Sequence, residues 1–268
     1  MNRKQTNKRK QIAVAVGVTL SVILFVLALV SVSLLKNKDK NNQNADYEEP
    51  QRTGSYKYEL LDNGTAKITS YEGNEAEPLI PDVLEGHKVT IIAEHAFEGN
   101  PNIEKIHIPD NITDIEPYAF RDCDKMTQIT FGSGLTEIRE CAFYSCGGLL
   151  EVNIPEGVKS VGDNAFRNCI DMKKVTLPQG LESIGKEAFY YCEFLEDINI
   201  PDTVTQIGDM AFGFCGAIED IYIPSSVTSI GHSVFFSCSQ DLVIKAPRGS
   251  GIIDEAIKNE IEYIETEE

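Results

Sequence analysis

Two consecutive stretches of the chain decide its fold. Residues 155–177 read PEGVKSVGDNAFRNCIDMKKVTL, and residues 178–200 read PQGLESIGKEAFYYCEFLEDINI. Both are 23 residues long and align without a gap. The same interval separates six cysteines and seven phenylalanines: Cys123, Cys146, Cys169, Cys192, Cys215 and Cys238, and Phe97, Phe120, Phe143, Phe166, Phe189, Phe212 and Phe235. A fixed period of this size is typical of one small structural unit stacked many times, and not of an ordinary globular core.

Each unit predicts two short strands and a turn. Residues 175–177 (VTL) alternate apolar and polar, so Val175 and Leu177 should point inward and Thr176 outward. Residues 158–161 (VKSV) form a second short extended segment. A glycine then follows in several units, where we expect a turn with positive φ, which glycine adopts at little cost: Gly162, Gly185, Gly208 and Gly231. These elements predict a mainly β solenoid with short parallel strands and little helix.

Different patterns flank the repeats and predict two caps. Residues 55–80 contain Asn63-Gly64 between two alternating segments, which is a strong β-hairpin signal. The repeats occupy residues 81–247 as about seven units. In residues 248–268, Ser250 is a plausible N-cap for a short helix, and a last short strand follows. Such caps would cover the open ends of the stack.

The repeats resemble the BspA-type leucine-rich repeat family. The resemblance rests on units of the form I-x-I-P-x-x-V-T-x-I-G-x-x-A-F-x-x-C-x-x-L, which residues 221–231 (IYIPSSVTSIG) begin to spell out. It implies a curved leucine-rich-repeat solenoid with a parallel sheet on its concave face. It also implies binding at the cell surface, with adhesion to host or neighbouring-cell molecules in some members. The ligand differs among members and does not carry over.

The N-terminal segment predicts a membrane anchor. Residues 12–35 carry no charge and are long enough, as a helix, to cross a bilayer. The basic residues in the flanking stretch 1–11 favour a cytoplasmic N-terminus. We expect an N-terminal transmembrane helix at the cell membrane, a flexible linker over residues 36–54 and an extracellular repeat domain. The small-residue pattern Ser31-Val32-Ser33 leaves cleavage as a signal peptide open.

The charge of the chain excludes one class of partner. The net charge is -18, and residues 41–268 alone carry 16 basic against 41 acidic residues, a net charge of -25. A body of this charge would repel nucleic acids and anionic lipid surfaces, so we expect no nucleic-acid partner. The acidity serves solubility or attracts a basic partner.

No pattern in the sequence predicts catalysis, a cofactor or a metal site. The nucleophile, zinc-protease and phosphate-loop motifs are missing, so we expect no enzyme activity and no cofactor. The six cysteines at the 23-residue interval would point the same way in adjacent units, whereas a disulfide needs Cβ atoms that face each other at about 3.8 Å. We therefore expect a reduced, buried structural ladder and no metal. Cys141 lies outside this ladder; we expect it at the surface, with a Cys141–Cys146 bond as an alternative.

Two surfaces are candidates for ligand binding. The first is the outward side of the longer strand, which is polar and varies between units; its candidate residues are Lys174, Asp197, Asn199, Asp220 and Tyr222. The second is the pair of positions that follows each repeated Phe; its candidates are Tyr144, Tyr190, Tyr191, Phe214 and Phe236. These aromatic residues could also stack on one another along the edge of the solenoid without binding anything.

These expectations combine into two hypotheses. The first is a membrane-anchored extracellular module that binds protein or glycan ligands without catalysis, in an adhesion-like role. The alternative is a structural envelope spacer or scaffold whose repeats pack on a partner subunit.

Overall fold

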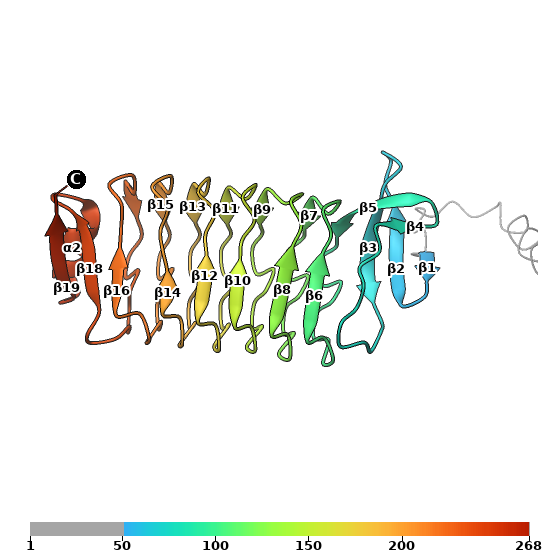
Figure 1. The fold of residues 1–268 in the computed structure, drawn as a ribbon, viewed down its shortest axis with the longest axis horizontal. Coiled ribbons are helices and arrows are strands. Elements are labelled where there is room, and N and C mark those ends of the chain that lie inside the picture. The colour runs from blue at the N-terminus through green and yellow to red at the C-terminus, as the bar shows by residue number, and fades with distance from the viewer. Residues whose placement is uncertain (1–50, 268) are drawn as a thin grey trace, which may run out of the picture. The chain divides into compact units, whose positions relative to one another are not determined.

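Short parallel strands stack side by side into two ladders (Figure 1). The computed structural model describes residues 51–267, which belong to one unit, Pro50–Glu268. The front ladder contains β6 (Lys105–Ile108), β8 (Gln128–Phe131), β10 (Glu151–Asn153), β12 (Lys174–Thr176) and β14 (Asp197–Ile198). The back ladder contains β9 (Glu137–Ile138), β11 (Ser160–Val161), β13 (Ser183–Ile184), β15 (Gln206–Ile207) and β17 (Ser229–Ile230).

The strand register equals the period of the sequence. Val152 pairs with Val175 in the front ladder, and Val161 pairs with Ile184 in the back ladder. One 23-residue repeat is therefore one coil of the solenoid. Along β12 the side chains are exposed, buried and exposed in turn, and Leu177 beyond it is buried. The predicted mainly β solenoid and the inward side of its strands are confirmed.

A third ladder joins the coils along what we call the turn edge, the stretch from each back strand to the repeated Cys. Backbone N–H groups here donate across coils: Phe166 to the carbonyl of Ala188, and Asn168 to that of Tyr190, both at 2.8 Å. Two positions of each coil have positive φ, mostly in residues other than glycine. The first set is His95, Tyr118, Cys141, Asn164, Glu187, Met210 and Ser233; the second is Gly99, Asp122, Ser145, Asn168, Tyr191, Phe214 and Ser237.

The repeated glycines do not have positive φ, so that expectation for Gly162, Gly185, Gly208 and Gly231 is wrong. They are needed because the backbones of adjacent coils approach closely at this column. A Cβ on Gly185 would lie 2.6 Å from the backbone nitrogen of Asp163, and one on Gly162 would lie 2.7 Å from that of Glu140. The left-handed turn positions lie a few residues later on the turn edge.

Replacing Gly185 by Ala should lower the free energy of unfolding by about 1–3 kcal/mol, because the new methyl group overlaps backbone that cannot move freely. Gly147→Ala is the matched control: its Cβ would meet no atom within 4 Å, and its φ is not positive. This control should be neutral or slightly stabilising. Urea unfolding of both variants checks the prediction, and equal stabilities would contradict it.

The repeated phenylalanines form a continuous buried stack. Adjacent rings from Phe97 to Phe235 have centroids 4.8 to 5.6 Å apart. Phe166 and Phe189 are nearly parallel, with 2° between their planes. Tyr71 of the N-terminal cap extends the stack, with its centroid 5.2 Å from that of Phe97. The stack thus links the cap and the coils into one core.

The repeated cysteines lie beside this stack as thiols. The first five are fully buried, and Cys238 is half-buried. Each sulfur donates a hydrogen bond to the carbonyl of the Phe one coil earlier, as Cys146 does to Phe120 at 3.0 Å. All seven cysteines, which fall within residues 51–267, are free.

Cys141 differs from expectation because it is buried, with 4% of its surface exposed, and it forms no bond with Cys146. It occupies a left-handed position, and its thiol shares a hydrogen bond with the Tyr118 side chain.

Because of the thiol ladder, the free energy of unfolding depends on pH in the alkaline range. Burial raises the pKa of Cys146, Cys169 and Cys215 well above the ordinary range, and that of Cys192 and Cys238 to about 12. An unfolded Cys has a pKa of about 8.5, so above this pH the unfolded chain releases protons that the folded chain keeps. The thiols therefore add stability that is complete below about pH 8.5 and is lost as pH rises toward the folded pKa.

We predict that the free energy of unfolding falls steadily between about pH 9 and pH 11. Urea unfolding across this range measures the slope. Cys192→Ala removes one such thiol and should make the slope shallower, although it also leaves a small cavity. An identical slope in wild type and variant would show that this thiol titrates alike in the folded and unfolded states.

The N-terminal cap contains the predicted hairpin, with β2 (Tyr56–Leu60) antiparallel to β3 (Ala66–Tyr71) and Gly64 at positive φ in the turn. β3 then pairs with β5 (His87–Ile92), which also pairs with β4 (Val83–Leu84) and β7 (Asp114–Ile115). A further strand, β1 (Gln51–Thr53), pairs with β2. It lies in the stretch 36–54 expected to be a flexible linker, so regular structure starts earlier than expected, because β2 offers it an open edge.

The C-terminal cap consists of a helix and a last strand. In α2 (Gly251–Lys258), Ile252, Ile253 and Ala256 are buried against the final coils. β19 (Glu262–Thr266) pairs with β18 (Val243–Pro247), which pairs with β16 (Asp220–Tyr222). Ser250 precedes the helix as predicted, but its hydroxyl donates to the carbonyl of Pro247 at 2.7 Å instead of capping the helix.

The predicted membrane anchor, residues 12–35, lies outside the described residues. Within residues 51–267, no helix has both the length and the apolar character that crossing a membrane requires.

Candidate binding site on the turn edge

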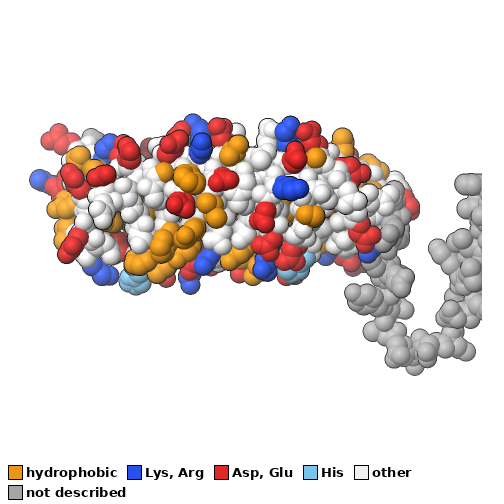
Figure 2. All heavy atoms as spheres, turned by 90° about the horizontal axis from the view of Figure 1, so that it is seen from below, with side chains coloured by type: hydrophobic (Ala, Val, Ile, Leu, Met, Phe, Trp, Pro, Cys, Tyr) orange, Lys and Arg blue, Asp and Glu red, His pale blue; other side chains and the backbone are white. Residues whose placement is uncertain are grey.

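Four side chains form one aromatic cluster near the C-terminal end of the turn edge, which we call the aromatic edge: Tyr190, Tyr191, Phe214 and Phe236. The ring centroid of Phe214 lies 5.2 Å from Tyr190, 5.4 Å from Tyr191 and 5.4 Å from Phe236. Tyr191 is 39% exposed and Phe236 is 48% exposed. Phe214 packs edge-on against Tyr190 and Phe236 and tilted against Tyr191. Tyr190 and Phe214 are half-buried, so Tyr191 and Phe236 are the rings that face solvent. From below, apolar side chains gather over the C-terminal half of the solenoid, with acidic side chains beside them (Figure 2).

The backbone at two of these residues is unfavourable for an aromatic side chain. Tyr191 has φ of 62° and Phe214 has φ of 59°. Other coils place small or polar residues at the same position: Gly99, Asp122, Ser145, Asn168 and Ser237. Gly, Asn and Asp tolerate this conformation, whereas other residues lose roughly 1–2 kcal/mol. The turn itself gives no reason for two adjacent aromatic residues here.

A glycine and an arginine set the position of Tyr190. A Cβ on Gly213 would lie 3.0 Å from Cδ2 of the Tyr190 ring, so Gly213 leaves the space into which this ring leans toward Phe214. The guanidinium carbon of Arg167 lies 4.5 Å from the Tyr190 centroid, and Arg167 forms an ion pair with Glu187. Cation–π contact and ion pair together hold Arg167 over the ring.

Tyr144, the fifth predicted aromatic, is not part of the aromatic edge. It is half-buried between Arg121 and Arg167, whose guanidinium carbons lie 5.5 and 6.0 Å from its centroid. Its ring face is therefore already covered by the protein's own cations.

The candidate residues of the front strands are exposed, and the three charged ones form ion pairs within the chain. Lys174 forms an ion pair with Asp197, and Asp220 forms one with Lys245 at 2.9 Å. Asn199 and Tyr222 are exposed on the same face, Tyr222 by 39%. The front ladder is interrupted between β14 and β16, so these residues belong to two sheets. The structure spreads them over a polar face and does not gather them into a site.

Two exposed apolar residues were missed from the sequence. Phe194 is 48% exposed, and its backbone N–H donates to the carbonyl of Ile170, which is 37% exposed. A signal was present: Phe194 occupies a column that otherwise holds small, polar or charged residues, namely Lys125, Gly148, Asp171, Ala217 and Gln240.

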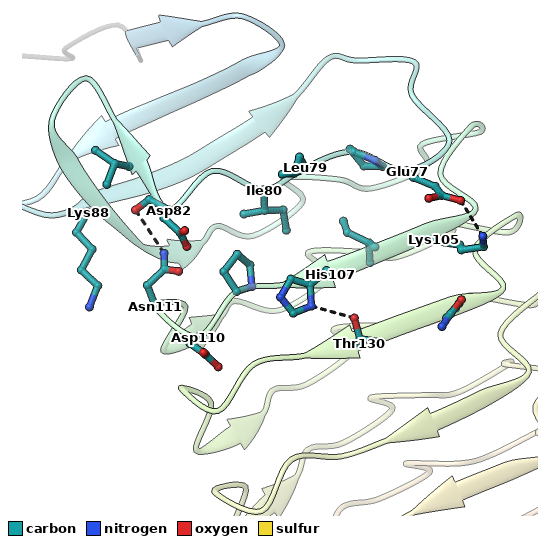
Figure 3. Close-up of a pocket in the computed structure, with 15 residues that line it drawn as sticks. Glu77, Leu79, Ile80, Asp82, Lys88, Lys105, His107, Asp110, Asn111 and Thr130 are labelled. Carbon is teal, nitrogen blue, oxygen red and sulfur yellow. Dashed lines mark hydrogen bonds and ion pairs between the residues drawn. The ribbon is translucent and has the colours of Figure 1, made fainter.

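The repeat pattern also gave no sign of a hollow of about 990 Å³ at the N-terminal end of the front ladder (Figure 3). It lies between the crossing segment 77–83 and the strands β6 and β8. Leu79 on its wall is 81% exposed. A volume of this size could hold a small molecule.

Most polar groups of the hollow already have partners. Lys105 forms an ion pair with Glu77 at 2.7 Å, and Nδ1 of His107 lies 2.9 Å from Oγ1 of Thr130 (Figure 3). Asn111 donates to the backbone carbonyl of Val89. These contacts fasten the cap to the first coils, so the hollow is a weaker candidate than the aromatic edge. The described part of the chain contains no group of three or more potential metal ligands.

A family model for the BspA type leucine rich repeat region matches residues 88–215 and 159–260, in six copies. The chain belongs to this family. A leucine rich repeat protein of T. pallidum superposes with a TM-score of 0.67 at 23% identity, over 82% of this chain and 100% of that one, which supports the fold.

Two further structures of this type resemble the chain less well. A leucine-rich repeat protein from Bacteroides capillosus is 33% identical over 48% of this chain and 98% of its own, with a TM-score of 0.44. A leucine rich cell surface protein from Faecalibacterium prausnitzii is 25% identical over 75% of this chain and 77% of its own, with a TM-score of 0.46. A comparison with curated proteins finds no match.

The aromatic edge should be dispensable for folding. In the double variant Tyr191→Asn with Phe214→Asn, lost ring contacts cost about 0.5–1.5 kcal/mol each, while relief of the left-handed backbone returns roughly 1–2 kcal/mol per residue. We expect the thermal midpoint to stay within a few degrees of the wild type. Phe189→Asn in the buried stack is the contrast and should lose at least 3 kcal/mol. A comparable loss in the double variant would mark its aromatic residues as packing residues.

Proposed function

We propose that this chain is a membrane-anchored extracellular module that binds a protein or glycan ligand through the aromatic edge, without catalysis and in an adhesion-like role. The observation that carries the proposal is the pair Tyr191 and Phe214. Both aromatic side chains occupy left-handed backbone positions; Tyr191 and Phe236 are exposed, and the half-buried Phe214 contacts both. Large aromatic residues in such positions are costly for the fold and suit binding hot spots.

Other features support the rest of the proposal. Membership of the BspA-type family favours a role at the cell surface. The uncharged stretch 12–35 and its basic flank favour an anchor with the repeats outside. The sequence carries no recognised catalytic motif, which favours binding over chemistry.

A structural spacer is the second candidate, because an exposed aromatic surface also suits permanent packing on an envelope subunit. The two functions differ in the partner. A binding module captures soluble ligands from outside, whereas a spacer remains bound to components of its own envelope.

The test uses intact cells that display the full chain, probed with labelled protein extracts and a panel of glycans. We expect the variant Tyr191→Asn with Phe214→Asn to lose at least about tenfold in ligand capture, since hot-spot aromatic residues each contribute on the order of 1–2 kcal/mol or more. Tyr222→Ser is the matched control, because Tyr222 is as exposed as Tyr191 but lies on the front strands.

Capture that is unchanged in the double variant, or lost equally in the control, would contradict a site on the aromatic edge. Recovery of envelope components alone would favour the spacer. The same cells test the topology: external protease should degrade the repeat domain, and full protection would contradict its extracellular placement.

A further inference from the structure

The aromatic edge lies in a stretch poor in basic residues, which is bounded by Lys186 and Lys245 and contains His232. Residues 187–244 include no Lys or Arg but nine Asp and Glu. Three of these acids pair with cations outside the run: Glu187 with Arg167, Asp197 with Lys174, and Asp220 with Lys245. The other six form no ion pair in the described part of the chain: Glu193, Glu196, Asp202, Asp209, Glu219 and Asp241.

Elsewhere on the turn edge, tyrosine rings contact cationic side chains of the chain itself. In one column of successive coils the residues are Arg121, Tyr144, Arg167 and Tyr190, and each arginine lies over a tyrosine ring. At the next coil the alternation stops at Gly213. Among the described residues, no cation lies over the rings of Tyr191, Phe214 or Phe236.

We propose that the aromatic edge binds a lysine- and arginine-rich segment of a protein partner; this inference rests on the proposed function. The cationic groups of the partner would lie over the exposed rings of Tyr191 and Phe236, as Arg167 lies over Tyr190 within the chain. The exposed carboxylates of Glu193 and Asp209, close in sequence to the rings, would complete the ion pairs.

Both features of the surface favour a cation over a neutral ligand. A glycan could use the rings but would gain nothing from the charge of Glu193 and Asp209, which form no ion pair, although Oδ1 of Asp209 accepts the backbone N–H of His232 at 2.7 Å. A Lys or Arg side chain uses both the rings and the carboxylates. The rings of Tyr191, Phe214 and Phe236 follow one another at 5.4 Å. Alternate side chains of an extended peptide lie about 7 Å apart, so basic residues at alternate positions would reach successive rings.

The experiment measures fluorescence anisotropy of labelled 12-residue peptides with the purified full chain in buffered saline. One peptide has Lys and Arg at alternate positions with Gly between them, and the matched peptide has Glu at those positions. We expect the basic peptide to bind and the acidic peptide not to bind. The variant Tyr191→Asn with Phe214→Asn should weaken binding of the basic peptide about tenfold.

Charge variants separate this site from general attraction to an acidic protein. Glu193→Lys places a cation at the aromatic edge and should weaken binding several-fold. Asp82→Lys makes the same change in charge at the N-terminal hollow and should alter affinity less than about twofold, because exposed charges beyond a Debye length are screened. Equal losses in these two variants, or full binding by the aromatic double variant, would overturn the proposal.

The outcome also distinguishes this inference from the proposed function. If the double variant loses its cell-surface ligand but the wild type does not bind the basic peptide, the aromatic edge is a binding site for a different chemistry, and only the cationic partner is refuted. If the basic peptide binds at the aromatic edge but capture by cells does not depend on this edge, the cationic partner is supported. The proposed capture of the cell-surface ligand through the aromatic edge is then refuted.

Discussion

The stacking of one coil on the next is the contact on which the whole structure depends. A single 23-residue coil cannot bury its own Phe or Cys, because their neighbours belong to the coils on either side. Phe166 stacks on Phe143 and Phe189 of the adjacent coils, and the thiol of Cys192 donates to the carbonyl of Phe166. Coils must therefore stay in register. At Gly185 the backbones of adjacent coils approach so closely that no side chain fits between them.

This dependence divides the sequence into two kinds of columns. Inward columns must repeat, because each side chain packs against its own equivalents, and the Phe stack and the thiol ladder are the result. Outward columns are free to vary, so function has to be sought where a residue departs from its column. Tyr191 and Phe214 depart from a column of small and polar residues, and the departure is costly because the backbone there is left-handed.

The same division explains what the sequence could predict. The period and the alternation of residues 175–177 were enough for the coil and its inward faces. The role of the repeated glycines was predicted wrongly. Glycine is favoured both at positive φ and where two backbones approach closely, and the sequence alone does not distinguish these two roles. The burial of Cys141 was not predicted because the other repeats have no cysteine at this position. The periodic pattern therefore does not indicate where its side chain lies. The N-terminal hollow could not be predicted, since it forms where the non-repeating segment 77–83 crosses β6.

The distribution of charged residues along the chain indicates a binding site better than the net charge does. A net charge of -18 is compatible with simple solubility and identifies no site. Its distribution is more informative: the repeat region supplies arginines to the rings of Tyr144 and Tyr190, then none over residues 187–244. Solubility alone requires charged residues there but no exposed aromatic rings. At the aromatic edge, the exposed rings of Tyr191 and Phe236 lie in a stretch whose carboxylates Glu193 and Asp209 form no ion pair, and no cation of the described residues lies over these rings. A cation of a partner would satisfy both groups.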